Sequence, residues 1–70
     1  MNKEEQRMRI GRDIATLRKQ QGKTQQDVAD ATGIQRNHIS RIEQGFYSVG
    51  FDSLQTIAEA LSADIKIIPK

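Results

Sequence analysis

Three glycines divide most of this chain into short segments, and this division limits the available folds more than any other feature. Gly22, Gly33 and Gly45 each follow a stretch whose apolar residues recur at helical spacing. Glycine readily adopts the left-handed conformation that ends a helix. The single proline, Pro69, lies near the far end, so no proline interrupts these stretches. The sequence therefore predicts an all-α domain of short helices stabilised by packing on one another.

The apolar pattern predicts four helices. The first covers about residues 3–21, and its apolar face carries Ile10, Ile14 and Leu17. The second follows the capping-box sequence Thr24-Gln25-Gln26-Asp27 and buries Val28, Ala29 and Thr32 before it ends at Gly33. The third covers about residues 35–44 and buries Ile39 and Ile42. The fourth starts at a Ser48 cap, which we favour over Asp52, and carries a buried stripe of Phe51, Leu54, Ile57, Ala58 and Leu61.

The last seven residues, 64–70, break the helical pattern. They are rich in β-branched side chains and approach Pro69, so they predict a short β-strand. No second strand is predicted, so this segment must pair with another molecule, lie as coil over its own helices, or stay disordered. We expect antiparallel pairing with a second copy through Ile65, Ile67 and Ile68, with Ile65 and Ile67 on the buried face. The chain then divides into a helical domain (1–63) and a dimerisation strand (64–70).

Composition limits the function classes. Seventy residues form one small domain, and the absence of cysteine excludes disulfides, thiol catalysis and cysteine-based zinc sites. No apolar run is long enough for a bilayer and no secretory signal is recognised, so a soluble, cytoplasmic protein is expected. Residues 1–23 hold seven basic and three acidic side chains. Such an excess attracts polyanions or simply keeps a helix solvated, and charge alone does not distinguish the two.

The third predicted helix points to DNA. Two short helices joined at Gly33 have the form of a helix-turn-helix. If Ile39 and Ile42 face the core, the opposite side carries Arg36, Asn37, Ser40 and Arg41. Arginine matches the acceptors of guanine and asparagine matches the edge of adenine. An ordinary solvated face is the alternative, but such a face more often carries Glu and Lys.

The chain resembles the lambda-repressor and Cro-like helix-turn-helix proteins, also called the xenobiotic-response-element family of bacterial and phage regulators. The resemblance spans residues 10–61 and rests on Ile10-Gly11, Ile14, Leu17-Arg18, Gly22, Thr24-Gln25, Val28-Ala29, Gly33-Ile34, Ile39-Ser40, Ile42-Glu43-Gln44-Gly45, Leu54, Ile57-Ala58 and Leu61. It implies a four- or five-helix domain that works as a homodimer on palindromic double-stranded DNA and represses transcription.

The resemblance also implies roles for individual residues. The residues implied to contact bases are Gln35, Arg36, Asn37, Ser40 and Arg41. Those implied to contact phosphate are Arg18, Thr24, Gln25, Tyr47 and Ser48. Arg18 and Glu43 match a pair that braces the recognition helix. The loop departs from the family, which often has Asn-Pro where this chain has Ser48-Val49. The resemblance therefore does not carry over the loop's backbone contacts with phosphate, and Tyr47 and Ser48 are the candidates to replace them.

Other functions find less support in the sequence. His38 is the single histidine and has no second ligand at a useful spacing, so no metal or other cofactor is expected. Ser40, His38 and Asp30 fall on different helix faces, which argues against a catalytic site and an enzyme. Some members of the family are antitoxins that also bind a toxin protein. A DNA-binding antitoxin therefore remains the alternative function.

Overall fold

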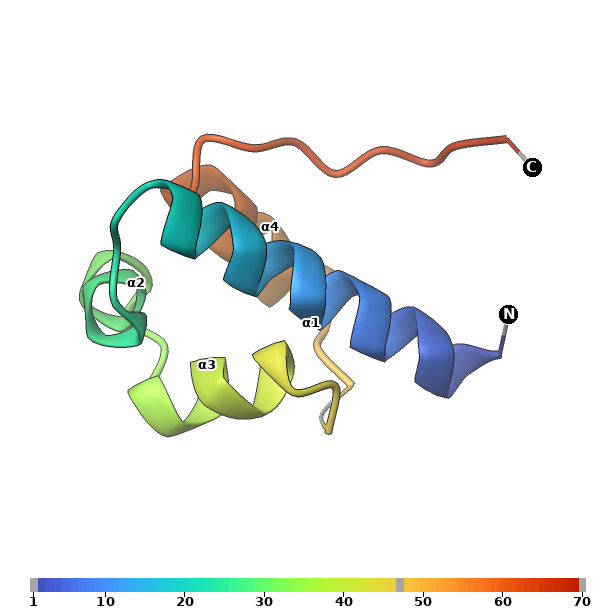
Figure 1. Cartoon of the computed structure of the whole chain (residues 1–70), viewed down its shortest axis with the longest axis horizontal. Helices are drawn as coiled ribbons and strands as arrows, with labels where there is room; N and C mark the ends of the chain where they lie inside the picture. The colour runs from blue at the N-terminus through green and yellow to red at the C-terminus, as the bar shows by residue number, and fades with distance from the viewer. Residues whose placement is uncertain (1, 47, 70) are drawn as a thin grey trace.

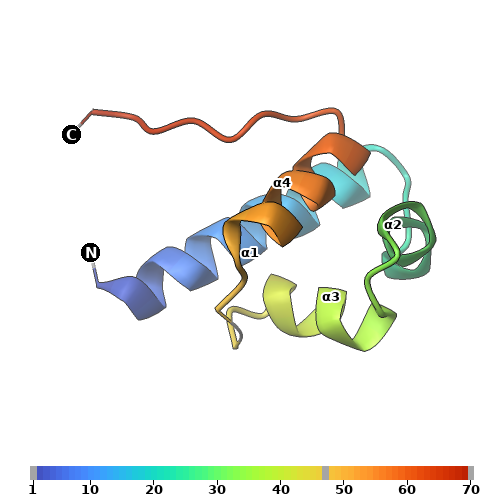
Figure 2. The same ribbon diagram turned by 180° about the vertical axis from the view of Figure 1, so that it is seen from behind.

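The computed structural model describes residues 2–46 and 48–69, and it confirms the all-α fold (Figure 1). This part of the chain forms four helices: α1 (Lys3–Gln20), α2 (Gln25–Thr32), α3 (Arg36–Glu43) and α4 (Phe51–Ala60). Helix α3 packs against α1 and α2, and α2 also packs against α4. In two opposite views, α3 lies along one edge of the molecule and the C-terminal segment along the other (Figures 1 and 2).

The predicted boundaries of the first three helices are confirmed to within about a residue. Gly22, Gly33 and Gly45 all have φ between +68° and +78°, the left-handed region that favours glycine. The capping box of α2 is complete: the Thr24 hydroxyl accepts from the Asp27 N–H at 3.0 Å, and the Asp27 carboxylate accepts from the Thr24 N–H at 2.8 Å. These bonds lower the pKa of Asp27, so the box is complete at neutral pH and is lost as pH falls through that lowered value.

The predicted start of α4 is wrong. The helix begins at Phe51 after an N-cap at Gly50, and neither Ser48 nor Asp52 caps it. Val49 packs against the core, which keeps the residues before α4 extended rather than helical. Phe51 is consequently the first residue of the helix and is 66% exposed, so its predicted place in the core is also wrong.

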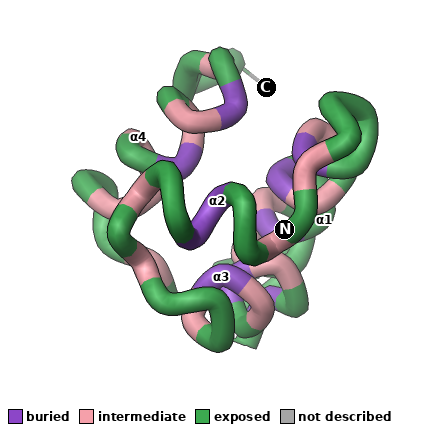
Figure 3. Tube along the Cα trace, turned by 90° about the vertical axis from the view of Figure 1, so that its left-hand side faces the viewer, coloured by how far each residue is buried: buried purple, intermediate pink, exposed green. Residues whose placement is uncertain are grey.

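A small core joins all four helices. Its buried residues are Ile14, Val28, Ala29, Ile39, Ile42, Ile57 and Leu61, and every one of them lies on a face predicted to be buried. Figure 3 shows buried positions on each of the four helices. None of the helices in residues 2–46 and 48–69 combines the length and the apolar character of a membrane span.

The predicted C-terminal strand is absent from residues 63–69. These residues follow an extended path without regular secondary structure (Figure 2). A strand needs a hydrogen-bonded neighbour, and the single chain offers none to this segment. In the single chain Ile67 is 99% exposed, while Ile68 borders a groove between α1 and α4. The face predicted for the paired strand stays a prediction, because it concerns a dimer.

Helix α1 approaches α3 closely at Gly11. A Cβ atom built on Gly11 would lie 2.4 Å from the Ile42 carbonyl oxygen and 2.6 Å from that of Glu43. Both are backbone atoms near the end of α3, so they cannot yield as the tip of a flexible side chain would. The glycine thus sets how closely the two helices pack, and with it the position of α3.

We predict that Gly11→Ala lowers the free energy of unfolding by about 1–3 kcal/mol, because the new methyl group overpacks the α1–α3 contact. The change should appear as a lower Tm in thermal melts followed by circular dichroism. Gly50→Ala is the control, since Gly50 has φ of −69° and nothing within 4 Å of its Cβ position. Equal stability of the two variants would contradict the assigned role of Gly11.

Candidate nucleic-acid interface

The outer face of α3 is polar and open to solvent. Arg36, Asn37 and Arg41 are exposed, whereas Ile39 and Ile42 on the opposite face are buried. The hydrophobic residues thus fix the rotation of the helix about its axis, and this rotation presents the three polar side chains outward. They have the hydrogen-bonding groups that match the edges of guanine and adenine.

The other two residues predicted to contact bases lie at the margins of this face. Gln35 is exposed but precedes the helix as its N-cap, and its side chain makes no capping bond. Ser40 is half-buried, and its hydroxyl accepts from the Gln44 amide at 3.3 Å. Asn37 lies beside Arg36, whose guanidinium approaches the Asn37 amide oxygen at 3.5 Å. The exposed set is therefore Gln35, Arg36, Asn37 and Arg41.

The C-terminal end of α3 is held by a hydrogen-bonded cluster around Glu43. Arg18 of α1 donates through Nε to Glu43 Oε2 at 2.7 Å and through Nη2 to Oε1 at 3.0 Å. The same guanidinium donates through Nη1 to the Lys23 carbonyl at 2.9 Å. Gln25 of α2 donates through Nε2 to Glu43 Oε1 at 3.1 Å. Three helices therefore meet at one carboxylate.

This ion pair is largely shielded from water. The side chains of Arg18 and Glu43 are 10% and 6% exposed. The hydrogen bonds to Glu43 raise the pKa of Arg18 above its already high ordinary value, against the opposing effect of burial, so the guanidinium stays charged. A charged pair with this little exposure must keep its partners, because removal of either leaves an uncompensated charge.

A shallow, open depression lined by polar residues adjoins the start of α2. Its volume is about 440 Å³ and its walls are formed by Arg18, Lys23, Thr24, Gln25, Gln26 and Arg36. It brings together the predicted phosphate contacts Thr24 and Gln25 with Arg36, the first residue of α3. Arg18 lines the depression, but its guanidinium donates hydrogen bonds to Glu43 and to the Lys23 carbonyl. The N-terminal end of α2 and its neighbouring cations favour an anion here.

The loop between α3 and α4 does not border this depression with Ser48, the loop residue that the structure describes among the predicted phosphate contacts. Ser48 is exposed and lies in a small cleft with Arg7, Ile10 and Val49, and it is absent from the walls of the depression. Tyr47, the other loop residue predicted to contact phosphate, lies outside the described residues. The structure thus brings Thr24 and Gln25 together without Ser48.

Two features of this surface were not predicted from the sequence. The hydrogen bond from Gln25 to Glu43 joins residues 18 positions apart, and only the packing of α2 on α3 brings them together. Lys23 accepts from Arg18 through its carbonyl and donates through Nζ to the Ala60 carbonyl at 2.9 Å, which ties the loop after α1 to the end of α4. A lysine at the carbonyl end of a helix is favourable, but the local sequence does not indicate which helix it meets.

Comparison with known proteins gives a family and two relatives. The helix-turn-helix family matches residues 14–68. The uncharacterized HTH-type transcriptional regulator y4dL of Sinorhizobium fredii is 33% identical over 61 residues, and the competence pilus inhibition repressor of Acinetobacter baylyi is 36% identical over 61 residues. Each match covers 87% of this chain, but only 31% and 56% of those relatives. No solved structure matches significantly.

A double-mutant cycle tests how strongly Arg18 and Glu43 interact. We predict that Glu43→Ala and Arg18→Ala each destabilise the fold, and that the coupling energy between them exceeds about 1 kcal/mol, the upper range for exposed pairs. Chemical denaturation of the four proteins in the cycle measures it. The matched control is the exposed Gln55–Glu59 contact in α4, which should couple by about 0.5 kcal/mol or less. Additive effects of Arg18→Ala and Glu43→Ala would contradict the brace.

Proposed function

This chain belongs to the helix-turn-helix family of lambda-repressor and Cro-like proteins, and on that basis we propose that it is a sequence-specific, double-stranded DNA-binding repressor. The observation that carries the proposal is the face of α3, where Arg36, Asn37 and Arg41 are exposed together. The helix enters the major groove, and these side chains contact base edges with Gln35 and Ser40 at the margins.

The depression at the start of α2 receives a phosphate of the DNA backbone. Thr24 and Gln25 border it, and Arg36 supplies positive charge, whereas the Lys23 ammonium donates to the Ala60 carbonyl. Gln25 has two amide hydrogens, and its hydrogen bond to Glu43 leaves the second available for a phosphate oxygen. Contacts of this kind position a protein on the duplex without selecting sequence. Ser48 and Tyr47 are further candidates for phosphate contacts.

Repression is the regulatory outcome that the relatives favour. One relative is named a repressor and the other a transcriptional regulator. A domain of this size, bound across a promoter, blocks access of the polymerase. The chain spans about a third and about half of the lengths of these two relatives, so the comparison supports the activity of this domain alone.

A second candidate function is that of a DNA-binding antitoxin. Phe46 and Phe51 are 75% and 66% exposed, although a DNA-reading surface does not require exposed phenylalanines. These two side chains flank the α3–α4 loop and are the candidates for contact with a protein partner. A neighbouring gene that encodes a kinase-like or RNase-like toxin would distinguish this function from repression alone.

The C-terminal segment provides the dimer. Ile65, Ile67 and Ile68 lie in a segment that runs along the edge of the molecule opposite α3 (Figure 1). If two such segments pair antiparallel, their two-fold axis is perpendicular to the two-stranded ribbon, and both α3 helices point to the same side. The two helices are then available to half-sites of one palindromic operator, about 34–36 Å apart.

The first prediction from this proposal separates base contacts from phosphate contacts. Arg36→Ala should weaken binding to the selected operator by about 1–3 kcal/mol and weaken binding to random DNA much less. Gln25→Ala should weaken both alike. Gel shifts on an operator selected from random duplexes and on unrelated duplex DNA measure the two effects. Arg12→Ala removes the same charge from an exposed position of α1 that borders neither the groove nor the depression, and serves as control. Equal loss on both DNAs for Arg36→Ala would contradict its role in base recognition.

The second prediction concerns the C-terminal segment. Removal of residues 64–70 should leave the helical domain folded, because the seven buried core residues all precede this segment. The shortened chain should be mostly monomeric and should bind full operators poorly. Circular dichroism reports the fold and sedimentation reports the mass. A shortened chain that still dimerises at micromolar concentration would place the interface elsewhere.

A further inference from the structure

A small cleft lies at the other end of α3 from the depression beside α2. It has a volume of about 90 Å³ and lies between α1, the last turn of α3, the loop after α3, and α4. Its walls are formed by Arg7, Ile10, Ile42, Ser48, Val49 and Leu54. In two opposite views, the loop lies on the same side of α1 as α3 (Figures 1 and 2). The cleft thus brings a cation of α1 beside Ser48, a candidate phosphate contact.

Close packing fixes the position of Arg7 relative to α3. A Cβ atom built on Gly45 would lie 2.8 Å from Met8 Cγ and 2.9 Å from Met8 Cα, so α1 contacts the chain directly after α3. The next residue, Phe46, donates its N–H to the Arg41 carbonyl at 3.1 Å and closes the end of the helix. Because Arg7 directly precedes Met8, the same backbone contact holds it at this end of α3.

The charge of Arg7 is available to an anion. Within residues 2–46 and 48–69, the single ion pair is that of Arg18 with Glu43, so Arg7 has no acidic partner there. The other walls of the cleft are apolar apart from Ser48. Arginine lays its methylene stem along apolar side chains and keeps its guanidinium in water. Arg7 is half-buried, as this arrangement requires.

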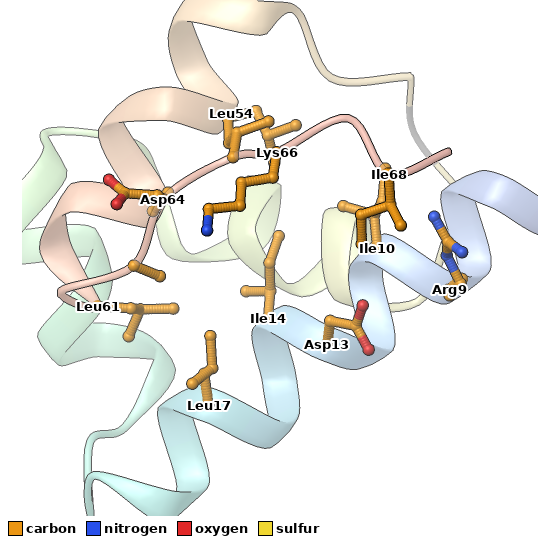
Figure 4. Close-up of a pocket in the computed structure, with 13 residues that line it drawn as sticks. Arg9, Ile10, Asp13, Ile14, Leu17, Leu54, Leu61, Asp64, Lys66 and Ile68 are labelled. Carbon is orange, nitrogen blue, oxygen red and sulfur yellow. The ribbon is translucent and has the colours of Figure 1, made fainter. Parts of the chain in front are cut away.

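The neighbouring arginines of α1 lie elsewhere. Arg9 borders the groove between α1 and α4, which Ile68 of the C-terminal segment also borders (Figure 4). Arg12 is exposed and borders neither this groove nor the cleft. Of these three arginines, Arg7 is the one beside the loop after α3. The periodicity of α1 thus selects one cation from the basic excess of residues 1–23 and places it next to the DNA-reading helix.

We propose that Arg7 and Ser48 hold a phosphate on the DNA strand opposite the one held at Thr24 and Gln25. This inference rests on the proposed function and adds a second contact to the DNA backbone. The depression adjoins Arg36, the first residue of α3, and the cleft adjoins its last turn. Eight residues of α-helix extend about 12 Å. The major groove is also about 12 Å wide, so α3 reaches from one strand to the other.

The chemistry of the cleft suits a phosphate. A guanidinium offers two parallel N–H donors to phosphate oxygens, and the exposed Ser48 hydroxyl can donate a further hydrogen bond. Contacts to phosphate position a protein on the duplex and do not select its sequence. Two such contacts, one at each end of α3, fix the depth and the tilt at which Arg36, Asn37 and Arg41 meet the bases.

Arg7→Met in the full chain tests this contact, because methionine keeps an apolar side chain in the cleft and removes the charge. Binding to operator and to unrelated duplex DNA should weaken alike, roughly five- to tenfold for each bound copy at about 0.1 M salt. The slope of log K against log salt should become shallower by about 0.9 for each copy. Anisotropy titrations over a range of salt concentrations measure both quantities. Arg7→Lys should keep the slope, and so should the matched control Arg12→Met.

Neutral phosphates locate the contact. A methylphosphonate group is placed at one backbone position of the operator at a time. At the phosphate that Arg7 contacts, this group should remove the difference in affinity between the unmodified chain and Arg7→Met. The phosphate that removes the difference for Gln25→Ala should lie on the other strand of the duplex.

The outcomes separate this inference from the proposed function. If Arg7→Met leaves the salt slope unchanged, the inference fails, even where binding and Tm both fall, because the side chain then acts through the fold alone. If Arg7 and Gln25 couple to phosphates of one strand, the inference also fails. In either case, selective binding of the operator by the unmodified chain leaves the proposed function intact. If the unmodified chain binds no duplex DNA, the proposed function itself fails.

Discussion

The carboxylate of Glu43 is the point on which the arrangement of the helices depends. It ends α3, accepts two hydrogen bonds from Arg18 of α1, and accepts a third from Gln25 of α2. A shielded ion pair of this kind contributes less net stability than its short distances suggest, because both charges lose hydration. Its larger effect is on geometry. The planar guanidinium accepts few orientations opposite a carboxylate, so the pair fixes the angle at which α3 leaves the body of the domain.

Packing supplies the second constraint on α3. Ile39 and Ile42 are buried at one face of an eight-residue helix, and Gly11 lets α1 approach its last turn. A helix this short is not stable in water by itself. Its order comes from these contacts, and its exposed face contributes little to the packing of the domain. Because the buried face alone holds the helix in place, the side chains of Arg36, Asn37 and Arg41 can point into solvent without weakening the fold.

Much of the fold was predictable because its signals are local. Left-handed glycines, a capping box and helical periodicity each act within a few residues, and these features set the first three helices and the buried face of α3. The start of α4 depends on Val49, which packs on residues far along the chain and so draws Gly50 out of the helix. The Gln25–Glu43 bond depends on how two helices cross. The C-terminal segment forms no strand in the single chain, because a strand requires a hydrogen-bonded neighbour and local pattern does not say which molecule supplies it.

The C-terminal segment and α3 lie along opposite edges of the molecule (Figure 1), so the surface proposed for dimerisation is separate from the surface proposed for base recognition. In the proposed DNA complex, side chains of α3 recognise the bases, whereas in the proposed dimer the pairing of the C-terminal segments sets the distance between the two α3 helices. On this proposal, substitutions at positions 64–68 should alter the spacing or the stability of the dimer without altering which bases each copy prefers. Substitutions at Arg36, Asn37 or Arg41 should do the reverse. The core connects the two surfaces, because Ile14 borders the groove and belongs to the same buried cluster as Ile39 and Ile42 of α3.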